Sequence, residues 1–211
     1  MTEENTNTRL EAFCDAVFSI ALTLLILEIK TPLAENIHSS DDLWTSLRHL
    51  LPSLFAFLLS FIVIIVSWVN HHATMKLVNK HTPYFIYANV FLLLTIVIIP
   101  FTTALLAEFC FTDAATPAVA LYSFVILLTN IGWIFLTRTA LQPHALTKSE
   151  AATLMMKRQS TQAKMAFVLY ALCTVLAFWF PIIIAVVISL TFLAWLILGL
   201  SYGEKPHSVK H

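Results

Sequence analysis

Six long runs of apolar residues, separated by short polar segments, dominate the pattern along the chain. They lie at residues 10–30, 50–70, 84–107, 118–137, 164–180 and 182–201, and each has about the 20 residues that a bilayer-spanning helix needs. The runs are continuous and do not alternate with a period of two, which favours helices over a membrane barrel of strands. The pattern predicts an all-α membrane protein with six transmembrane helices, in a single domain that spans residues 1–211.

Three prolines lie at or inside these runs and bear on where helices begin. Pro181 separates the last two runs with almost no loop, which predicts a tight helical hairpin. Pro100 and Pro52 fall inside the third and second runs, where a local kink is expected. For Pro52 a second possibility stays open, namely that it starts a new helix after a short external one beginning near Ser40 and Asp41.

The basic residues predict the orientation, because cytoplasmic loops retain lysine and arginine. If the N-terminus, the 71–83 and 138–163 segments and the C-terminus share one side, that side holds all of the 12 lysines and arginines except Lys30, Arg48. Its members are Arg9, Lys76, Lys80, Arg138, Lys148, Lys157, Arg158, Lys164, Lys205 and Lys210. Both termini are therefore predicted to be cytoplasmic, with an even number of spans.

Composition narrows the function further. Hydrophobic residues make up 59% of the chain and charged residues 11%, which is too apolar for a soluble domain. The formal net charge is zero and no long cationic run occurs, so nucleic acid is not an expected partner. Cys14, Cys110 and Cys173 form no CxxC pair, and we expect packing residues, neither a disulfide framework nor a zinc site. No serine elbow, phosphate-binding loop or HExxH string occurs, so neither an enzyme nor a cofactor is predicted.

The first run carries charged residues that a membrane helix does not normally contain. Asp15 lies inside it, about 9 Å along the helix from Arg9, and a charge near the bilayer centre costs at least about 2.5–3.5 kcal/mol. Ile20, Leu24 and Leu27 share one face by their spacing, and Asp15 points about 140° away from Ile20. Periodicity alone leaves open whether this aliphatic face packs against protein, meets lipid or lines a pore.

The same run contains the string Arg9-x-x-x-Phe13-Cys14-Asp15-Ala16-Val17-Phe18-Ser19-Ile20-Ala21-x-Thr23-Leu24-Leu25. This string resembles the signature of the transmembrane protein 175 family of potassium channels. The family pattern is Arg-x-x-x-Phe-Ser-Asp, so Cys14 departs from it. Since a thiol is a weaker hydrogen-bond donor than a hydroxyl, that substitution puts the residue's contact in question. Six runs in about 200 residues are similar to the prokaryotic members, which have one repeat.

The resemblance implies a potassium-selective homotetramer in a prokaryotic plasma (inner) membrane, with K⁺ and other monovalent cations as permeant ions and the lipid bilayer as surroundings. Its pore would be lined by four first helices, with no re-entrant pore loop. Ile20 would form the hydrophobic constriction, followed outward by Leu24 and Leu27, with Thr23 as the nearby hydroxyl. In keeping with this, the sequence has no glycine-rich filter, and the 31–49 segment contains no glycine.

A second patch, Ser67-Trp68-Val69-Asn70-His71-His72, ends the second run and is also similar to a family motif. We expect a hydrogen-bond network that joins Arg9 and Asp15 to Trp68 and one of the two histidines, beside Phe13 and Cys14. Trp68 as an interfacial anchor, and His71 and His72 as solvated loop residues, are the alternatives. A metal site is disfavoured, because adjacent residues point apart on a helix.

Two other functions stay open on the sequence. An ion- or proton-coupled secondary transporter would show inverted repeats and helices broken by glycine or proline near the midplane, and Pro100 is the one candidate break. A non-conducting membrane assembly protein would use Arg9 and Asp15 for packing alone.

Overall fold

The computed structural model describes residues 3–142 and 146–203, and within them the chain folds into helices and no strand. They are α1 (Glu3–Leu24), α2 (Ser40–His49), α3 (Leu51–Leu77), α4 (Pro83–Phe109), α5 (Ala115–Ala140), α6 (Glu150–Leu176) and α7 (Pro181–Gly203), with 3₁₀ turns η1 (Leu25–Glu28) and η2 (Ala34–Asn36). The predicted all-α class is confirmed. Five helices, α1, α3, α4, α5 and α7, are long and apolar enough to cross a membrane. α6 is equally long, but its first half is polar.

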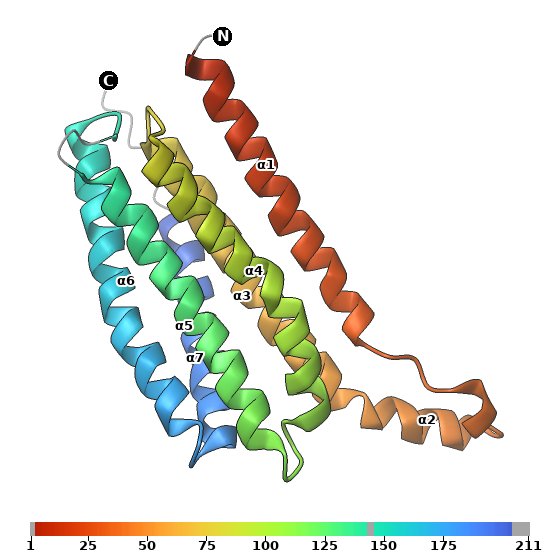
Figure 1. Ribbon diagram of the computed structural model, residues 1–211. Helices are drawn as coiled ribbons and strands as arrows, with labels where there is room; N and C mark the ends of the chain where they lie inside the picture. The colour runs from red at the N-terminus through yellow and green to blue at the C-terminus, as the bar shows by residue number, and fades with distance from the viewer. Residues whose placement is uncertain (1–2, 143–145, 204–211) are drawn as a thin grey trace.

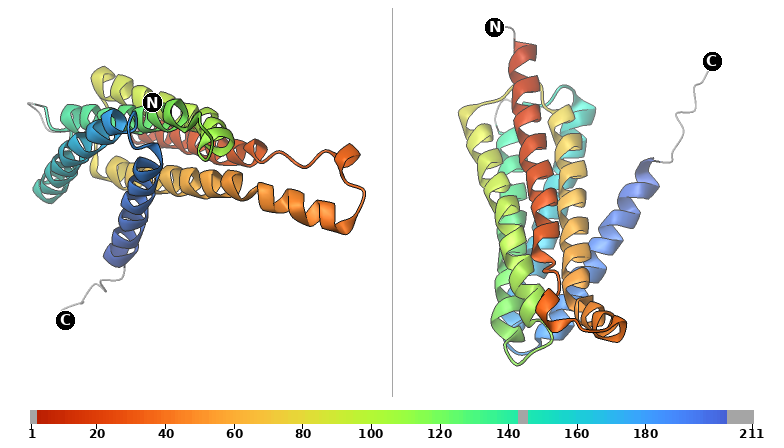
Figure 2. Two further views of the ribbon diagram at one scale, coloured as in Figure 1. Left: turned by 90° about the horizontal axis from the view of Figure 1, so that it is seen from below. Right: turned by 90° about the vertical axis from the view of Figure 1, so that its right-hand side faces the viewer.

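The long helices form a bundle in which α3, α4, α5 and α6 lie side by side (Figure 1). α1 crosses one face and packs on α3 and α4, whereas α7 packs on α3 and α5 and leans away from the others (Figure 2). The short helix α2 projects sideways at the end of the bundle where α1 finishes. One face of α1 therefore has the bundle behind it, and none of the described helices covers the other face.

Pro52 does not kink a helix, so the first of the two expectations was wrong. It lies in the first turn of α3, where a missing amide hydrogen has no consequence. The second expectation is confirmed, because α2 precedes it and begins at Ser40. The hydroxyl of Ser39 caps α2 by accepting a hydrogen bond from the amide of Asp42 at 3.1 Å.

The helices extend beyond the apolar runs, which corrects the predicted loops. α3 continues to Leu77, so most of the expected 71–83 loop is helical, and α6 begins at Glu150, inside the expected 138–163 loop. Ser149 explains the early start of α6, since its hydroxyl accepts from the amide of Ala152 at 3.2 Å. α6 also ends at Leu176, before the predicted boundary at 180, so residues 177–180 connect it to α7 where almost no loop was predicted. Because α7 packs mainly on α3 and α5, the last two runs do not form the predicted tight hairpin.

The connections at the end where α1 begins are tied together. The amide of Asn79 donates to the carbonyl of Leu146 at 2.7 Å, and that of Lys148 donates to the carbonyl of Leu77 at 2.9 Å. These bonds join the α3–α4 connection to the α5–α6 connection. At the opposite end Lys30 pairs with Glu108 at 3.7 Å, an exposed contact that stabilises little.

Buried hydroxyl groups join the middle of the bundle. Ser60 on α3 is hydrogen-bonded to the phenol oxygen of Tyr122 on α5 at 3.0 Å, and Thr103 on α4 donates to Ser60 at 2.6 Å. All three residues are fully or almost fully buried. In a bilayer such bonds between small polar residues hold helices together.

Gly132→Ala should destabilise the bundle, because α4 and α5 touch at this glycine. An added Cβ would lie 3.0 Å from the Cα of Leu92 and 3.1 Å from its Cβ, and backbone cannot move aside cheaply. Overpacking of this kind costs about 1–3 kcal/mol. Thermal unfolding in detergent measures it. Gly199→Ala is the matched control, since nothing lies within 4 Å of its added Cβ; an equal Tm for both variants would contradict the contact.

Candidate functional site

The first helix has a buried face that fixes it on the bundle. Cys14, Phe18, Ala21 and Leu25 recur with helical spacing and are almost completely inaccessible to solvent. They belong to the main hydrophobic core, together with side chains of α3, α4 and α5. The apolar spacing of this face therefore sets which side of α1 remains uncovered.

The uncovered side of α1 carries the aliphatic face predicted from the sequence. Its residues Ile20, Leu24 and Leu27 are called the aliphatic ladder below. Ile20 is 58% exposed, Leu24 39% and Leu27 70% within one subunit. Thr23 lies beside them and its hydroxyl donates to the carbonyl of Ile20 at 2.9 Å, which leaves the hydroxyl oxygen free to accept. In a membrane helix an exposed aliphatic row of this kind faces either lipid or another chain.

The C-terminal end of the ladder, at Leu24 and Leu27, differs from the predicted geometry. The α-helix ends at Leu24, and residues 25–28 form a 3₁₀ turn, so the 100° spacing assumed up to Leu27 was wrong. In a 3₁₀ helix, residues three apart lie directly above one another. The tighter turn therefore places Leu27 in line with Leu24, and the ladder is straighter than an α-helix would make it.

Asp15 is held by a residue of the second patch. The indole Nε1–H of Trp68 on α3 donates to Oδ1 of Asp15 at 2.8 Å. On its other side the indole stacks on His72, one turn further along α3, with ring centroids 5.9 Å apart and planes at 21°. The length of this hydrogen bond is well within the ordinary range, and the contact joins α1 to α3 beside the buried face of α1.

Behind this pair a buried chain of hydrogen bonds joins three helices. Nε2 of His71 on α3 lies 2.7 Å from Oδ1 of Asn89 on α4, and Nδ2 of Asn89 donates to the sulfur of Cys14 on α1 at 3.0 Å. Because the Asn89 oxygen can only accept, His71 donates through Nε2. The thiol of Cys14 thus serves as an acceptor. Phe18 of α1 also packs against the His71 ring, with centroids 5.3 Å apart.

Asn89 was missed at the sequence level. The sequence does contain a signal for Asn89, because an amide side chain inside the apolar 84–107 run is costly unless it has a hydrogen-bond partner. Its partners lie on two other helices, 18 and 75 residues away along the chain, so no local spacing pointed to them.

Two residues of the motif do not join the network in a single subunit. Arg9 and Phe13 are both exposed on α1, and among the described residues no hydrogen bond or ion pair connects Arg9 with Asp15. A separation of six helical residues turns Arg9 about 120° around the axis from Asp15 and about 9 Å along it. Over the same described residues, no group of three His, Cys, Asp or Glu side chains lies together as a metal site would require.

Asn89→Leu should lower the Tm, because it leaves the His71 N–H without an acceptor in the core. An unsatisfied buried donor costs about 1–3 kcal/mol. The double variant His71→Phe with Asn89→Leu removes both partners and should recover part of the loss. Thermal unfolding of the wild type, the single and the double variant measures this coupling, and strictly additive losses would contradict a direct bond.

The fold and the site together define an all-helical membrane protein whose motif-bearing first helix is anchored on one face and uncovered on the other. A sequence model of the family described as endosomal/lysosomal potassium channel TMEM175 matches residues 9–100. The crystal structure of a lysosomal potassium-selective channel TMEM175 homolog from Chamaesiphon minutus superposes with a TM-score of 0.81 at 32% identity, covering 92% of this chain and 98% of that one. The chain belongs to the TMEM175 family.

Further relatives agree with this assignment. A protein named potassium channel from Chamaesiphon minutus is 44% identical over 129 residues, which are 61% of this chain and 63% of the relative. Another potassium channel, from Streptomyces collinus, is 39% identical over 140 residues, 64% and 66% of the two chains. These matches span slightly less than two thirds of each relative's own length. The structure of a variant of the potassium channel MtTMEM175, 18% identical with a TM-score of 0.64, shows the same fold.

Proposed function

We propose that this protein is the subunit of a homotetrameric potassium channel whose pore is lined by α1. The observation that carries the proposal is the exposed Ile20, Leu24 and Leu27 ladder on α1, the helix that bears the Arg9–Leu25 motif, within the region that matches the family. The names of the relatives support the choice of ion. One ladder cannot enclose a channel, whereas four copies around a symmetry axis cover it and create matching layers of side chains.

The narrowest layer is assigned to Ile20. Four isoleucine side chains meeting on an axis form a dry constriction that an ion crosses with little of its hydration shell. K⁺ holds its water less tightly than Na⁺ and loses less at such a point, so discrimination arises without a ring of backbone carbonyls. Gating then consists of widening or wetting this constriction. Thr23, one turn outward, offers a hydroxyl oxygen to a partly dehydrated cation.

Asp15, Trp68 and the His71–Asn89–Cys14 chain position α1 and do not touch the ion. Their bonds run from α1 to α3 and α4, on the opposite flank from the ladder. A helix that is anchored on one flank presents its other face at a fixed distance from the axis. Small displacements of this anchor would change the width of the constriction.

The membrane arrangement proposed here has six spans, with α6 as the sixth beside the five apolar helices, and no re-entrant loop. Both termini face the cytoplasm of a prokaryotic cell, and the inner membrane is the expected location. The support is the basic residues near the α3–α4 and α5–α6 connections, Lys76, Lys80, Arg138 and Lys148. The first half of α6, with Lys157 and Arg158, belongs to the same side.

Measuring K⁺ release from liposomes that contain the protein tests the proposal. Purified protein in K⁺-loaded vesicles should release K⁺ down its gradient with no coupling ion, and release should be faster than that of Na⁺ under matched conditions. Empty vesicles and vesicles with denatured protein are the controls. Flux that saturates and requires a second ion would identify a transporter instead, and a folded protein without any flux would indicate an assembly role.

A further inference from the structure

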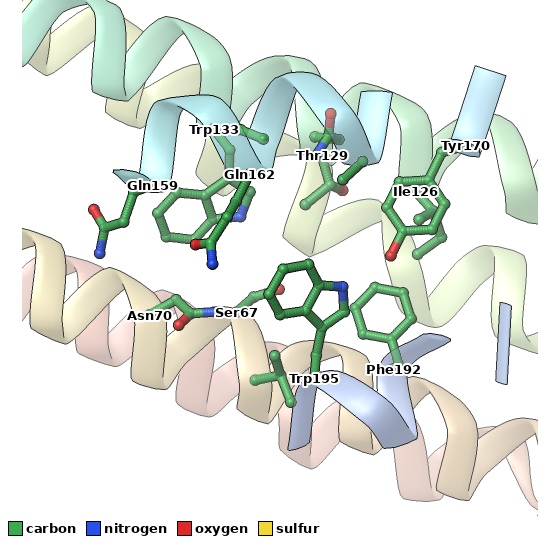
Figure 3. A pocket seen from close by; sticks show the side chains of 14 residues that line it. Ser67, Asn70, Ile126, Thr129, Trp133, Gln159, Gln162, Tyr170, Phe192 and Trp195 are labelled. Carbon is green, nitrogen blue, oxygen red and sulfur yellow. The ribbon is translucent and has the colours of Figure 1, made fainter. Parts of the chain in front are cut away.

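A cavity separate from the α1 site lies between α3, α5, α6 and α7 (Figure 3). Its volume is about 120 Å³. Its lining includes residues of α6, among them Ala166 and Tyr170, and of α7, Phe192 and Trp195. The pocket is partly open to the outside of the bundle, and its volume leaves room for a molecule of one or two small rings.

The lining divides into an aromatic part and an amide part. Figure 3 shows the rings of Tyr170 and Phe192 at one end, with the amide groups of Asn70, Gln159 and Gln162 toward the other. Tyr170 and Phe192 stack with centroids 5.9 Å apart and planes at 12°. None of the 14 described lining residues is charged. Such walls suit a neutral ligand with a flat face, because aromatic rings stack and no ion would find a counter-charge.

Asn130 supplies an unused hydrogen-bonding group at this cavity. The residue lines the cavity and is only 7% exposed, and its Oδ1 has no donor within the described part of the chain. A buried amide oxygen without a donor is costly. The terminal torsion of asparagine is broad, so the amide can turn this oxygen toward a donor in the cavity.

We propose that the cavity binds a small, flat, uncharged aromatic molecule that carries one N–H or O–H donor, a compound of the indole class. The ring packs between the indoles of Trp133 and Trp195, and its donor binds Oδ1 of Asn130. The cavity also adjoins the motif-bearing part of α3, because Trp133 contacts the His71 ring with centroids 6.4 Å apart.

The test uses 5-fluoroindole as the probe and ¹⁹F NMR as the readout, with the full chain in detergent micelles. Saturable broadening should occur with the wild type and with Ala151→Leu, an exposed position on α6. Ala166→Leu, which fills the cavity from the same helix, should abolish it. Asn130→Leu should weaken binding about tenfold, the loss of one hydrogen bond. Unlabelled indole should displace the probe, whereas indene, which has the same shape without the N–H, should compete about tenfold less well.

Each other outcome overturns part or all of the inference. Non-saturable broadening equal to that of empty micelles means that the cavity holds only water or detergent. Unchanged binding in Ala166→Leu places the probe elsewhere on the protein. Equal competition by indole and indene, with unchanged affinity in Asn130→Leu, removes the donor and with it the assigned role of Asn130.

Discussion

Replacing Ile20 by asparagine is expected to remove most of the discrimination between K⁺ and Na⁺ and to leave the protein folded and tetrameric. Ile20 lies on the uncovered face of α1 and makes no contribution to the buried face formed by Cys14, Phe18, Ala21 and Leu25, so its loss does not open the core. A ring of four amides would hydrate the constriction. The dehydration penalty that separates the two ions then falls, and the permeability ratio approaches that of a water-filled pore.

The reversal potential under bi-ionic conditions, K⁺ on one side and Na⁺ on the other, measures this ratio directly. Ile20→Val is the matched control, because it keeps the ring apolar and β-branched and should keep most of the selectivity. A reversal potential in Ile20→Asn that equals that of the wild type would remove the constriction from Ile20.

Replacing Asp15 by alanine is expected to reduce tetramer yield or channel opening strongly while selectivity among the remaining open channels persists. The change leaves the Trp68 Nε1–H, 2.8 Å from the lost carboxylate, without its acceptor, at a cost of about 1–3 kcal/mol. That cost falls on the contact that holds α1 against α3. The ladder itself points elsewhere, so the chemistry of the constriction is unaltered.

Two further variants separate the bond from other effects of Asp15. Asp15→Asn keeps an acceptor oxygen and should restore much of the lost assembly. Trp68→Phe should reproduce the defect, and combining it with Asp15→Ala should add little, because both changes remove the same bond. The readouts are size-exclusion chromatography for tetramer yield and single-channel recording for open probability. Wild-type values in Asp15→Ala, or losses that add fully in the double variant, would contradict the assigned role.

The order of the long helices followed from the sequence, because bilayer-length apolar runs are a strong signal; five of the six long helices, all but α6, are apolar enough to cross a membrane. The ends of the helices did not follow from it. α6 begins where Ser149 caps it, in a polar segment outside the apolar run, and α3 continues to Leu77 through residues that are too polar to count as membrane. Hydropathy indicates whether a segment lies in lipid or in water, whereas capping residues and turns decide where a helix begins and ends.

Some features of the candidate site could likewise be predicted from the sequence, and others could not. The exposed face of α1 could be read from helical spacing, and the motif placed Asp15 and Trp68 in one region. The 3₁₀ turn at Leu25–Glu28 and the role of Asn89 could not be anticipated, because they depend on how α1 meets α3 and α4 in space. The predicted link between Arg9 and Asp15 is not among the hydrogen bonds and ion pairs of the described residues, whereas the predicted link between Asp15 and Trp68 is present.

The most direct measurement for the central claim is disulfide cross-linking at Leu27 combined with K⁺ flux. Leu27→Cys is introduced in a background without Cys14, Cys110 and Cys173, and the protein is oxidised in liposomes. If four ladders face one axis, cross-links form between subunits, flux falls, and a reductant restores it. Ile197→Cys on α7 is the control and should leave flux unchanged. Cross-linking at Ile197 but not at Leu27, or oxidation of Leu27→Cys without any change in flux, would remove the pore from α1.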